Sequence, residues 1–235
     1  MDPLLTDEER LEQIKKWWKT HGMSLLAGLA LGISVVWGWG YYKESNNATS
    51  TKASIEYYNL TRVLSFMERK TYLGAKTDKK IKARLEEVEV KFEEIIRNYG
   101  GTVYAIDSAL VLARRAIAKN DLAEANKRLQ WAIGQTNTSG YKHHIIRLRL
   151  ARVQRDQKKY ADALKTLSVK APSQFSIMYS FVKGTVFERQ KQCPKARSAY
   201  QISIKVMEAQ DKKKQVQFKD LKQTIQRRLE NVQNC

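Results

Sequence analysis

Residues of the types that perform chemistry are sparse in this sequence. The three histidines are His21, His143 and His144, and the last two are adjacent. Adjacent positions on a helix point about 100° apart, so these two imidazoles cannot readily hold one metal ion. The chain has no Cys-x-x-Cys or His-x-x-x-His pair, no phosphate-binding glycine loop and no Gly-x-Ser-x-Gly elbow. We therefore predict no catalytic residues, no metal site and no cofactor, and a protein that is not an enzyme.

The densest acidic residues are also better explained without catalysis. One predicted helix holds Glu86, Glu87, Glu89, Glu93 and Glu94 together with many bases. Opposite charges three or four positions apart on a helix form solvated pairs. No nucleophile with a partner base stands out elsewhere in the chain, so binding is a better hypothesis than catalysis.

A repeat of small and bulky residues supports a binding protein. Three stretches each have a small residue, an alanine twelve positions later and a bulky residue four positions after that. These positions are Ala113, Ala125 and Leu129; Ala151, Ala163 and Leu167; and Gly184, Ala196 and Tyr200. Two antiparallel helices approach closely only where both present small side chains. The pattern is typical of tetratricopeptide repeats, whose period is about 34 residues; the alternative is a generic bundle with alanines at its crossings.

In such a stack, the first helix of each pair lines a concave face that binds other proteins. Register with the small residues predicts that this groove is lined by Leu110, Arg114 and Ile117, then Leu148, Arg152 and Arg155, then Phe181, Thr185 and Glu188. An apolar and basic lining suits extended or acidic segments of a protein partner. The alternative is that these residues are solvated or covered by a preceding hairpin.

The remaining elements are also predicted to be helical. Apolar stripes at helical spacing cover residues 57–67 and 81–99, which should pack as a hairpin. A last stripe, from Phe218 to Val232, should cap the stack. The predicted fold is all-α. Its expected parts are a short cytoplasmic amphipathic segment (1–22), a transmembrane anchor (23–42), a linker and helical hairpin (43–100), and tetratricopeptide-like repeats with a C-terminal capping helix (101–235).

The anchor is predicted from an uncharged run near the N-terminus. Residues 20–42 contain no charge if His21 is neutral, and a bilayer core of about 30 Å needs about 20 helical residues. Aromatic residues flank both ends of the run: Trp17, Trp18, Trp37, Trp39, Tyr41 and Tyr42. The run is too long for a cleaved signal peptide, and bulky rings occupy the place of a cleavage site. Gly28 and Gly32 form a Gly-x-x-x-Gly pair, which permits close approach of another transmembrane helix.

The orientation of the anchor follows from the flanking bases. Four bases precede the run and two follow it at similar range: Arg10, Lys15, Lys16 and Lys19, against Lys43 and Lys52. Cytoplasmic flanks are enriched in Lys and Arg, so we predict a single-pass protein with a cytoplasmic N-terminus.

The part of the chain after the anchor is strongly basic. The whole chain has a formal charge of +19, and the first 42 residues hold four bases and five acids, so the rest carries +20. A basic domain could bind anionic lipid or an envelope polymer, which is our alternative function. Because the bases are scattered, solvated faces explain them more simply, and we expect no nucleic-acid partner. The two cysteines, Cys193 and Cys235, could be a loose pair or two free thiols.

Three stretches resemble the bacterial YfgM family of ancillary SecYEG translocon subunits: EERLEQIKKWWKTHGMSLLAGLALG, YGGTVYAIDSALVLARRAIAKNDLAEANKRLQWAI and LRLARVQRDQKKYADALKTL. The acidic lead into two tryptophans and a lysine is the most specific part. The resemblance implies one span in the bacterial inner membrane, a cytoplasmic N-terminus and a periplasmic tetratricopeptide-like domain. It also implies three partners: the SecYEG translocon, the membrane-anchored chaperone PpiD, and translocating envelope proteins. The chain departs from the family in its basic charge and in its degraded third repeat, where Lys183 stands in an apolar position.

Overall fold

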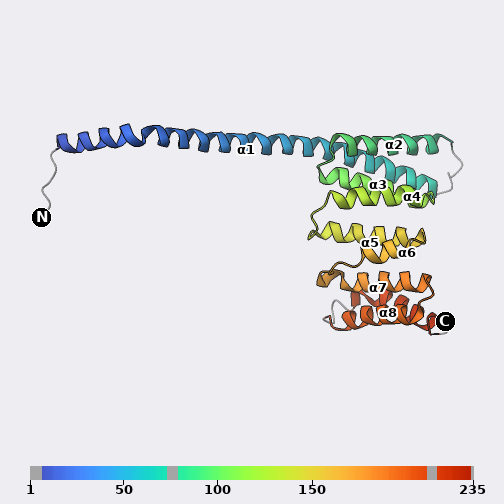
Figure 1. Cartoon of the computed structure of the whole chain (residues 1–235). Helices are drawn as coiled ribbons and strands as arrows, with labels where there is room; N and C mark the ends of the chain where they lie inside the picture. The colour runs from blue at the N-terminus through green and yellow to red at the C-terminus, as the bar shows by residue number, and fades with distance from the viewer. Residues whose placement is uncertain (1–6, 73–78, 211–215, 234–235) are drawn as a thin grey trace. The chain divides into compact units, whose positions relative to one another are not determined.

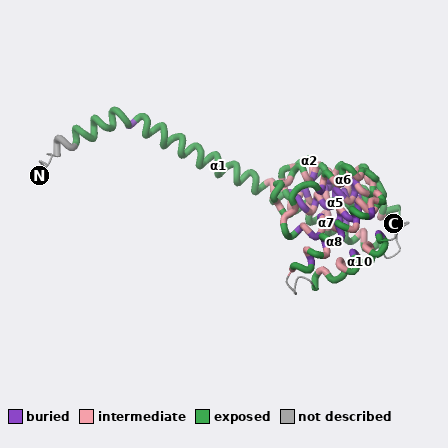
Figure 2. Tube along the Cα trace, turned by 60° about the horizontal axis from the view of Figure 1, so that its bottom comes forward, coloured by how far each residue is buried: buried purple, intermediate pink, exposed green. Residues whose placement is uncertain are grey.

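The computed structural model describes residues 7–72, 79–210 and 216–233. The chain divides into two units, Met1–Lys52 and Ala53–Cys235. The described residues form helices joined by turns, with no strand among them, which confirms the predicted all-α fold. Buried positions gather in the second unit, whereas the residues that precede it are exposed almost throughout (Figure 2).

The first helix, α1 (Asp7–Tyr72), contains the predicted anchor. Within the described residues, the stretch Leu11–Tyr72 is long and apolar enough to cross a membrane by length and composition. Only 6% of its most apolar window is buried inside the protein, unlike the core helix of a soluble domain. Residues 43–52 continue the helix, so the polar segment after the anchor is a helical extension.

The end of α1 forms a hairpin with α2 (Lys79–Asn98), as predicted. Leu64 of α1 is buried against Leu85, Val88, Phe92 and Ile95 of α2. The ring centroids of Tyr57 and Phe92 lie 6.1 Å apart, edge to face. The turn expected between the two helices falls mostly at residues 73–78, which lie outside the described residues.

The three repeats are the helix pairs α3 (Val103–Ala118) and α4 (Leu122–Gly134), α5 (Tyr141–Asp156) and α6 (Tyr160–Thr166), and α7 (Ser173–Arg189) and α8 (Cys193–Glu208). They stack in chain order (Figure 1). The small and bulky residues of the repeat pattern are all buried at the crossings, Ala113, Ala125 and Leu129 among them. The repeat pattern therefore predicted the crossings correctly.

Each pair turns through a residue with positive φ. These residues are Asn120, Lys158 and Lys191, with φ of 60°, 63° and 58°. At each turn, the next amide donates to the carbonyl five residues back, as from Asp121 to Ala116 at 2.8 Å. This pattern closes the end of the first helix of each pair. Asp121 then caps α4 by accepting a hydrogen bond from the Glu124 amide at 2.9 Å.

The second and third repeats differ from the first. The second repeat has a shorter second helix, and the third is covered by an additional helix. α6 has seven residues, from Tyr160 to Thr166, whereas α4 has thirteen. α10 (Lys219–Asn231) covers the end of the stack. Ile225 and Val232 are buried there beside Met207 and Tyr200, at the place expected of a capping helix. Cys193, which begins α8, is disulfide-bonded, so it is not a free thiol; Cys235 lies outside the described residues.

Candidate protein-binding groove

The structure places five of the nine predicted groove residues in one pocket between α3, α4 and α5. These residues are Leu110, Arg114, Ile117, Arg152 and Arg155, and the pocket has a volume of about 410 Å³. Ala113, Leu122, Leu129 and Val153 supply the rest of its apolar surface. The first helices of the first two repeats therefore combine to form a basic-rimmed, apolar groove.

The other four predicted residues do not line this pocket. Leu148 is buried with Phe175 and Tyr179 in the core between α5 and α7, because it faces the third repeat. Phe181 is partly buried and packs against the cores on both sides of α7. For these two residues, the predicted groove position is corrected to a core position.

Thr185 and Glu188 are engaged inside the stack. Thr185 is buried, and its Oγ1 accepts a hydrogen bond from Nη1 of Arg155 at 2.9 Å. Glu188 accepts hydrogen bonds from the Tyr200 hydroxyl and from Nη1 of Arg228, the latter at 2.8 Å. Both residues hold α7 to neighbouring helices. Their predicted role in a binding groove is therefore corrected to a structural one.

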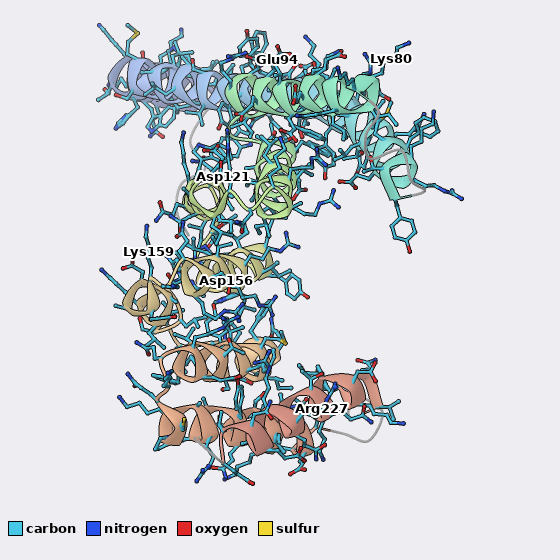
Figure 3. The ribbon with its side chains drawn as sticks, turned by 90° about the vertical axis from the view of Figure 1, so that its right-hand side faces the viewer. Lys80, Glu94, Asp121, Asp156, Lys159 and Arg227 are labelled. Atoms are coloured by element: carbon cyan, nitrogen blue, oxygen red, sulfur yellow. The ribbon has the colours of Figure 1, made fainter. Side chains whose placement is uncertain are left out.

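Four arginines at the groove differ in how they are neutralised. Arg155 pairs with Asp156 at 2.8 Å, a residue labelled on α5 in Figure 3. Arg114 pairs with Glu68 of α1 at 3.2 Å, with 60% of its own side chain exposed. Neither Arg149 nor Arg152 has a hydrogen bond or an ion pair to another described residue. The groove therefore contains two cationic groups that the fold does not neutralise directly.

The electrostatic environment of Arg152 reflects this imbalance. Burial lowers the pKa of the Arg152 guanidinium, and the positive charges of Arg155 and Arg149 lower it further, while Asp156 acts in the opposite direction. The side chain is half-buried. An arginine stays protonated in proteins, so Arg152 holds a positive charge where that charge is poorly compensated.

The groove continues past the predicted residues onto α1. A second pocket, of about 470 Å³, shares Leu110, Arg114 and Arg149 with the first. Its far side is formed by Tyr57, Thr61, Leu64, Ser65 and Glu68 of α1. Sequence reasoning missed Arg149 and this wall. Arg149 precedes Arg152 and Arg155 at intervals of three residues, which is the helical spacing that could have identified it.

A separate, apolar groove lies on the predicted span. Gly28 and Gly32 line it with Leu25, Leu29, Ile33, Val36 and Trp37, and its volume is about 670 Å³. A Cβ atom built on either glycine would have no atom within 4 Å. The two predicted glycines therefore form a surface hollow that another helix could enter.

The two adjacent histidines serve the fold. Both are buried. The His143 Nδ1 atom lies 2.8 Å from Oγ1 of Thr136, and its Nε2 lies 2.7 Å from Nη2 of Arg147. The His144 Nδ1 atom lies 2.9 Å from the Tyr179 hydroxyl. Within the described ranges, no three His, Cys, Asp or Glu side chains gather as a metal site would require.

The stacked helix pairs and their groove define a helical-repeat protein of the tetratricopeptide type. The family described as "Tetratricopeptide repeat-like domain" matches residues 15–231, and the chain belongs to this family. No solved structure matches the chain significantly.

Curated relatives carry one name, "Ancillary SecYEG translocon subunit", in agreement with the resemblance drawn from the sequence. The relative from Escherichia coli (strain K12) is 26% identical over 85% of this chain and 87% of its own length. The relative from Haemophilus influenzae is 24% identical over 77% of this chain and 80% of its own length. The relative from Neisseria gonorrhoeae is 23% identical over 86% and 90%, respectively.

Proposed function

We propose that this protein is a non-enzymatic, membrane-anchored scaffold and an ancillary subunit of the SecYEG translocon. The observation that carries the proposal is the extent of the similarity to proteins of that name, which covers 85% of this chain and 87% of the Escherichia coli relative. The match to the tetratricopeptide repeat-like family, over residues 15–231, includes both the apolar span and the repeats.

The span docks the protein beside the translocon within the inner membrane. Its hollow at Gly28 and Gly32 is apolar and open. In lipid, helices associate by close packing at small residues, because the hydrophobic effect does not drive them together. The hollow is accordingly the part of α1 best suited to receive a transmembrane helix of a partner.

The N-terminus is cytoplasmic and the repeats are periplasmic. Four bases precede the uncharged run and two follow it, which favours a cytoplasmic N-terminus. The disulfide at Cys193 also supports this orientation, since disulfides persist in the periplasm and are rare in the cytosol. In the periplasm, the groove receives a PpiD-type membrane-anchored chaperone or segments of translocating envelope proteins, and so links translocation to folding.

Filling the hollow tests the translocon assignment. We expect Gly28→Leu, alone or with Gly32→Leu, to reduce co-purification of SecYEG from membranes by about tenfold, since close packing is lost. Gly38→Leu is the matched control, because Gly38 is equally free of neighbours and lies outside the hollow. If wild-type protein captures no SecYEG component, the proposed function is wrong. Equal co-purification of SecYEG by all variants would show that the translocon contacts another part of the protein.

A topology reporter fused after Cys235 tests the orientation independently. The proposal requires a periplasmic signal from the reporter. A cytoplasmic signal would reverse the orientation and remove the periplasmic chaperone from the set of partners.

A further inference from the structure

The pocket between α3, α4 and α5 combines two kinds of surface. Its rim bears Arg149 and Arg152, which have no hydrogen-bond or ion-pair partner among the described residues. Its floor includes Ala113 and Leu129, both of which are buried. A positive rim above an apolar floor is complementary to a ligand that has a negative charge next to an apolar group.

The charge of the rim is costly to the protein without a ligand. Arg152 is half-buried, and its nearest charged neighbours include two further arginines, Arg149 and Arg155. Asp156, the carboxylate that acts on the Arg152 charge, is already paired with Arg155 at 2.8 Å. An incoming carboxylate would therefore gain charge-assisted hydrogen bonds and remove repulsion between the arginines.

Arg114 can add to this site from the opposite wall. Its pair with Glu68 spans 3.2 Å, and 60% of its side chain is exposed. Exposed pairs of this kind contribute little to stability, about 0–1 kcal/mol. The guanidinium can thus leave Glu68 for a ligand at little cost.

The groove has room for a chain that runs past the carboxylate. The pocket shares Leu110, Arg114 and Arg149 with the pocket against α1. The hydroxyls of Thr61 and Ser65 and the ring of Tyr57 line that continuation, together with two carboxylates, Glu68 and Asp107, that are paired with Arg114 and Lys142. These groups can accept and donate hydrogen bonds to a peptide backbone, so the second pocket suits an extended chain.

We propose that the pocket binds an acidic side chain of an extended protein segment, with the carboxylate between Arg149 and Arg152 and a neighbouring aliphatic side chain on the apolar floor. The proposal rests on the proposed function in one respect, since it takes the occupant to be a protein segment. It adds the sequence chemistry of that segment: Asp or Glu next to Leu, Ile or Val. Arg149 and Arg152 select the acid, and Ala113 and Leu129 select the aliphatic group.

Three peptides measured against the full chain test the proposal. The protein is placed in nanodiscs of phosphatidylcholine, so that the bilayer adds no net charge. The first peptide is an amidated ten-residue chain that alternates leucine and glutamate. The second has glutamine in place of glutamate, and the third has serine in place of leucine. We expect only the first to bind well, and its affinity to fall as salt is raised.

Two variants and one control place the binding at the pocket. Arg152→Gln and Arg149→Gln should each weaken binding of the first peptide by about tenfold or more, as for a lost charge-assisted hydrogen bond. Arg227→Gln makes the same change of charge at an exposed position of α10 (Figure 3) and should leave the affinity within about twofold. Arg149 is exposed, so its variant tests the site without disturbing the core.

Several results would overturn the proposal. Equal affinity for the glutamate and glutamine peptides would show that the pocket does not recognise a carboxylate. An equal loss of affinity in all three variants would show that only the net charge of the protein matters. Displacement of the peptide from the wild-type protein by anionic vesicles, together with weaker vesicle binding by Arg152→Gln, would assign the pocket to lipid. SecYEG capture is read separately, so peptide binding without capture defeats the proposed function alone, and capture without peptide binding defeats this inference alone.

Discussion

The first helices of the first and third repeats, α3 and α7, hold equivalent places in the repeat register but have different surroundings. On α3, Leu110, Arg114 and Ile117 line an open groove. The equivalent residues on α7 are Phe181, Thr185 and Glu188, and these are packed or hydrogen-bonded within the stack. The same register therefore supplies an open groove in one repeat and an internal joint in another.

The two regions also differ in how they neutralise buried polar groups. Glu188 of α7 accepts hydrogen bonds from Tyr200 and Arg228. Burial raises the pKa of the Tyr200 hydroxyl, and its hydrogen bond to Glu188 raises that pKa further. The groove beside α3 and α5 instead leaves Arg152 without a partner. A charged group that the fold leaves without a partner needs an explanation, and a ligand is the explanation proposed for Arg152.

Truncating one apolar residue in each region should give the largest contrast. Ile225 of α10 is fully buried against the third repeat, so Ile225→Ala should reduce the free energy of unfolding by about 2–4 kcal/mol through loss of packing. Ile117 in the open groove is 45% exposed, and Ile117→Ala should cost less than about 1 kcal/mol. Urea unfolding of both variants, followed by circular dichroism, measures the difference. Equal costs would mean that α10 does not seal the third repeat.

Adding a methyl group at the third crossing should have the next largest effect. A Cβ atom at Gly184 would collide with the ring of Tyr200, and Tyr200 is itself fully buried. We expect Gly184→Ala to destabilise the protein by about 2 kcal/mol, as typical overpacking does. Gly134→Ala, at a helical glycine with open space, should be neutral or stabilising by up to about 1 kcal/mol. Thermal unfolding of the two variants measures the difference. Equal melting temperatures for Gly184→Ala and Gly134→Ala would show that the Tyr200 ring can move aside freely.

The histidines between the two regions predict a dependence of stability on pH. Burial, then the charge of Arg147, lowers the pKa of His143 and of His144 in the folded protein. The unfolded chain then binds more protons below the ordinary value of about 6.5, so stability falls as pH decreases from about 6.5 toward the folded pKa. Above that window, these groups contribute no pH dependence. His144→Gln should reduce the loss of unfolding free energy between about pH 7 and pH 5, as measured by urea unfolding at each pH. An unchanged dependence on pH would mean that other groups cause the loss.

The smallest effect is expected at the turns within the repeats. Lys158 has φ of 63°, a conformation that costs a residue with a side chain about 1 kcal/mol relative to glycine. Lys158→Gly should therefore stabilise the protein by about 0.5–1 kcal/mol. Asn120→Gly should gain less, since asparagine tolerates this conformation. The absence of any gain at Lys158 would indicate that its side chain adds no strain.

The helix crossings could be predicted because small residues at fixed spacing encode them locally. Ala113, Ala125 and Leu129 are buried as the pattern required. The groove could be predicted only in part, since register tells which face of a helix is shared but not what covers it. α10 lies far along the chain from Glu188, yet Arg228 reaches that residue.

Two features had weaker local signals. Arg149 is exposed, and an exposed arginine resembles any solvated base until the pocket around it is known. The end of α1 joins the groove through tertiary packing of Leu64, which periodicity within α1 does not specify.

The constant spacing within each helix pair has an evolutionary consequence. From the small residue of the first helix to the alanine of the second is twelve positions in every pair, whereas successive pairs stand 38 and 33 residues apart. The difference of five residues therefore lies between the crossings, in the second helices and their connections. A lineage that inserts or deletes residues there would change the spacing of successive helix pairs while leaving each crossing intact.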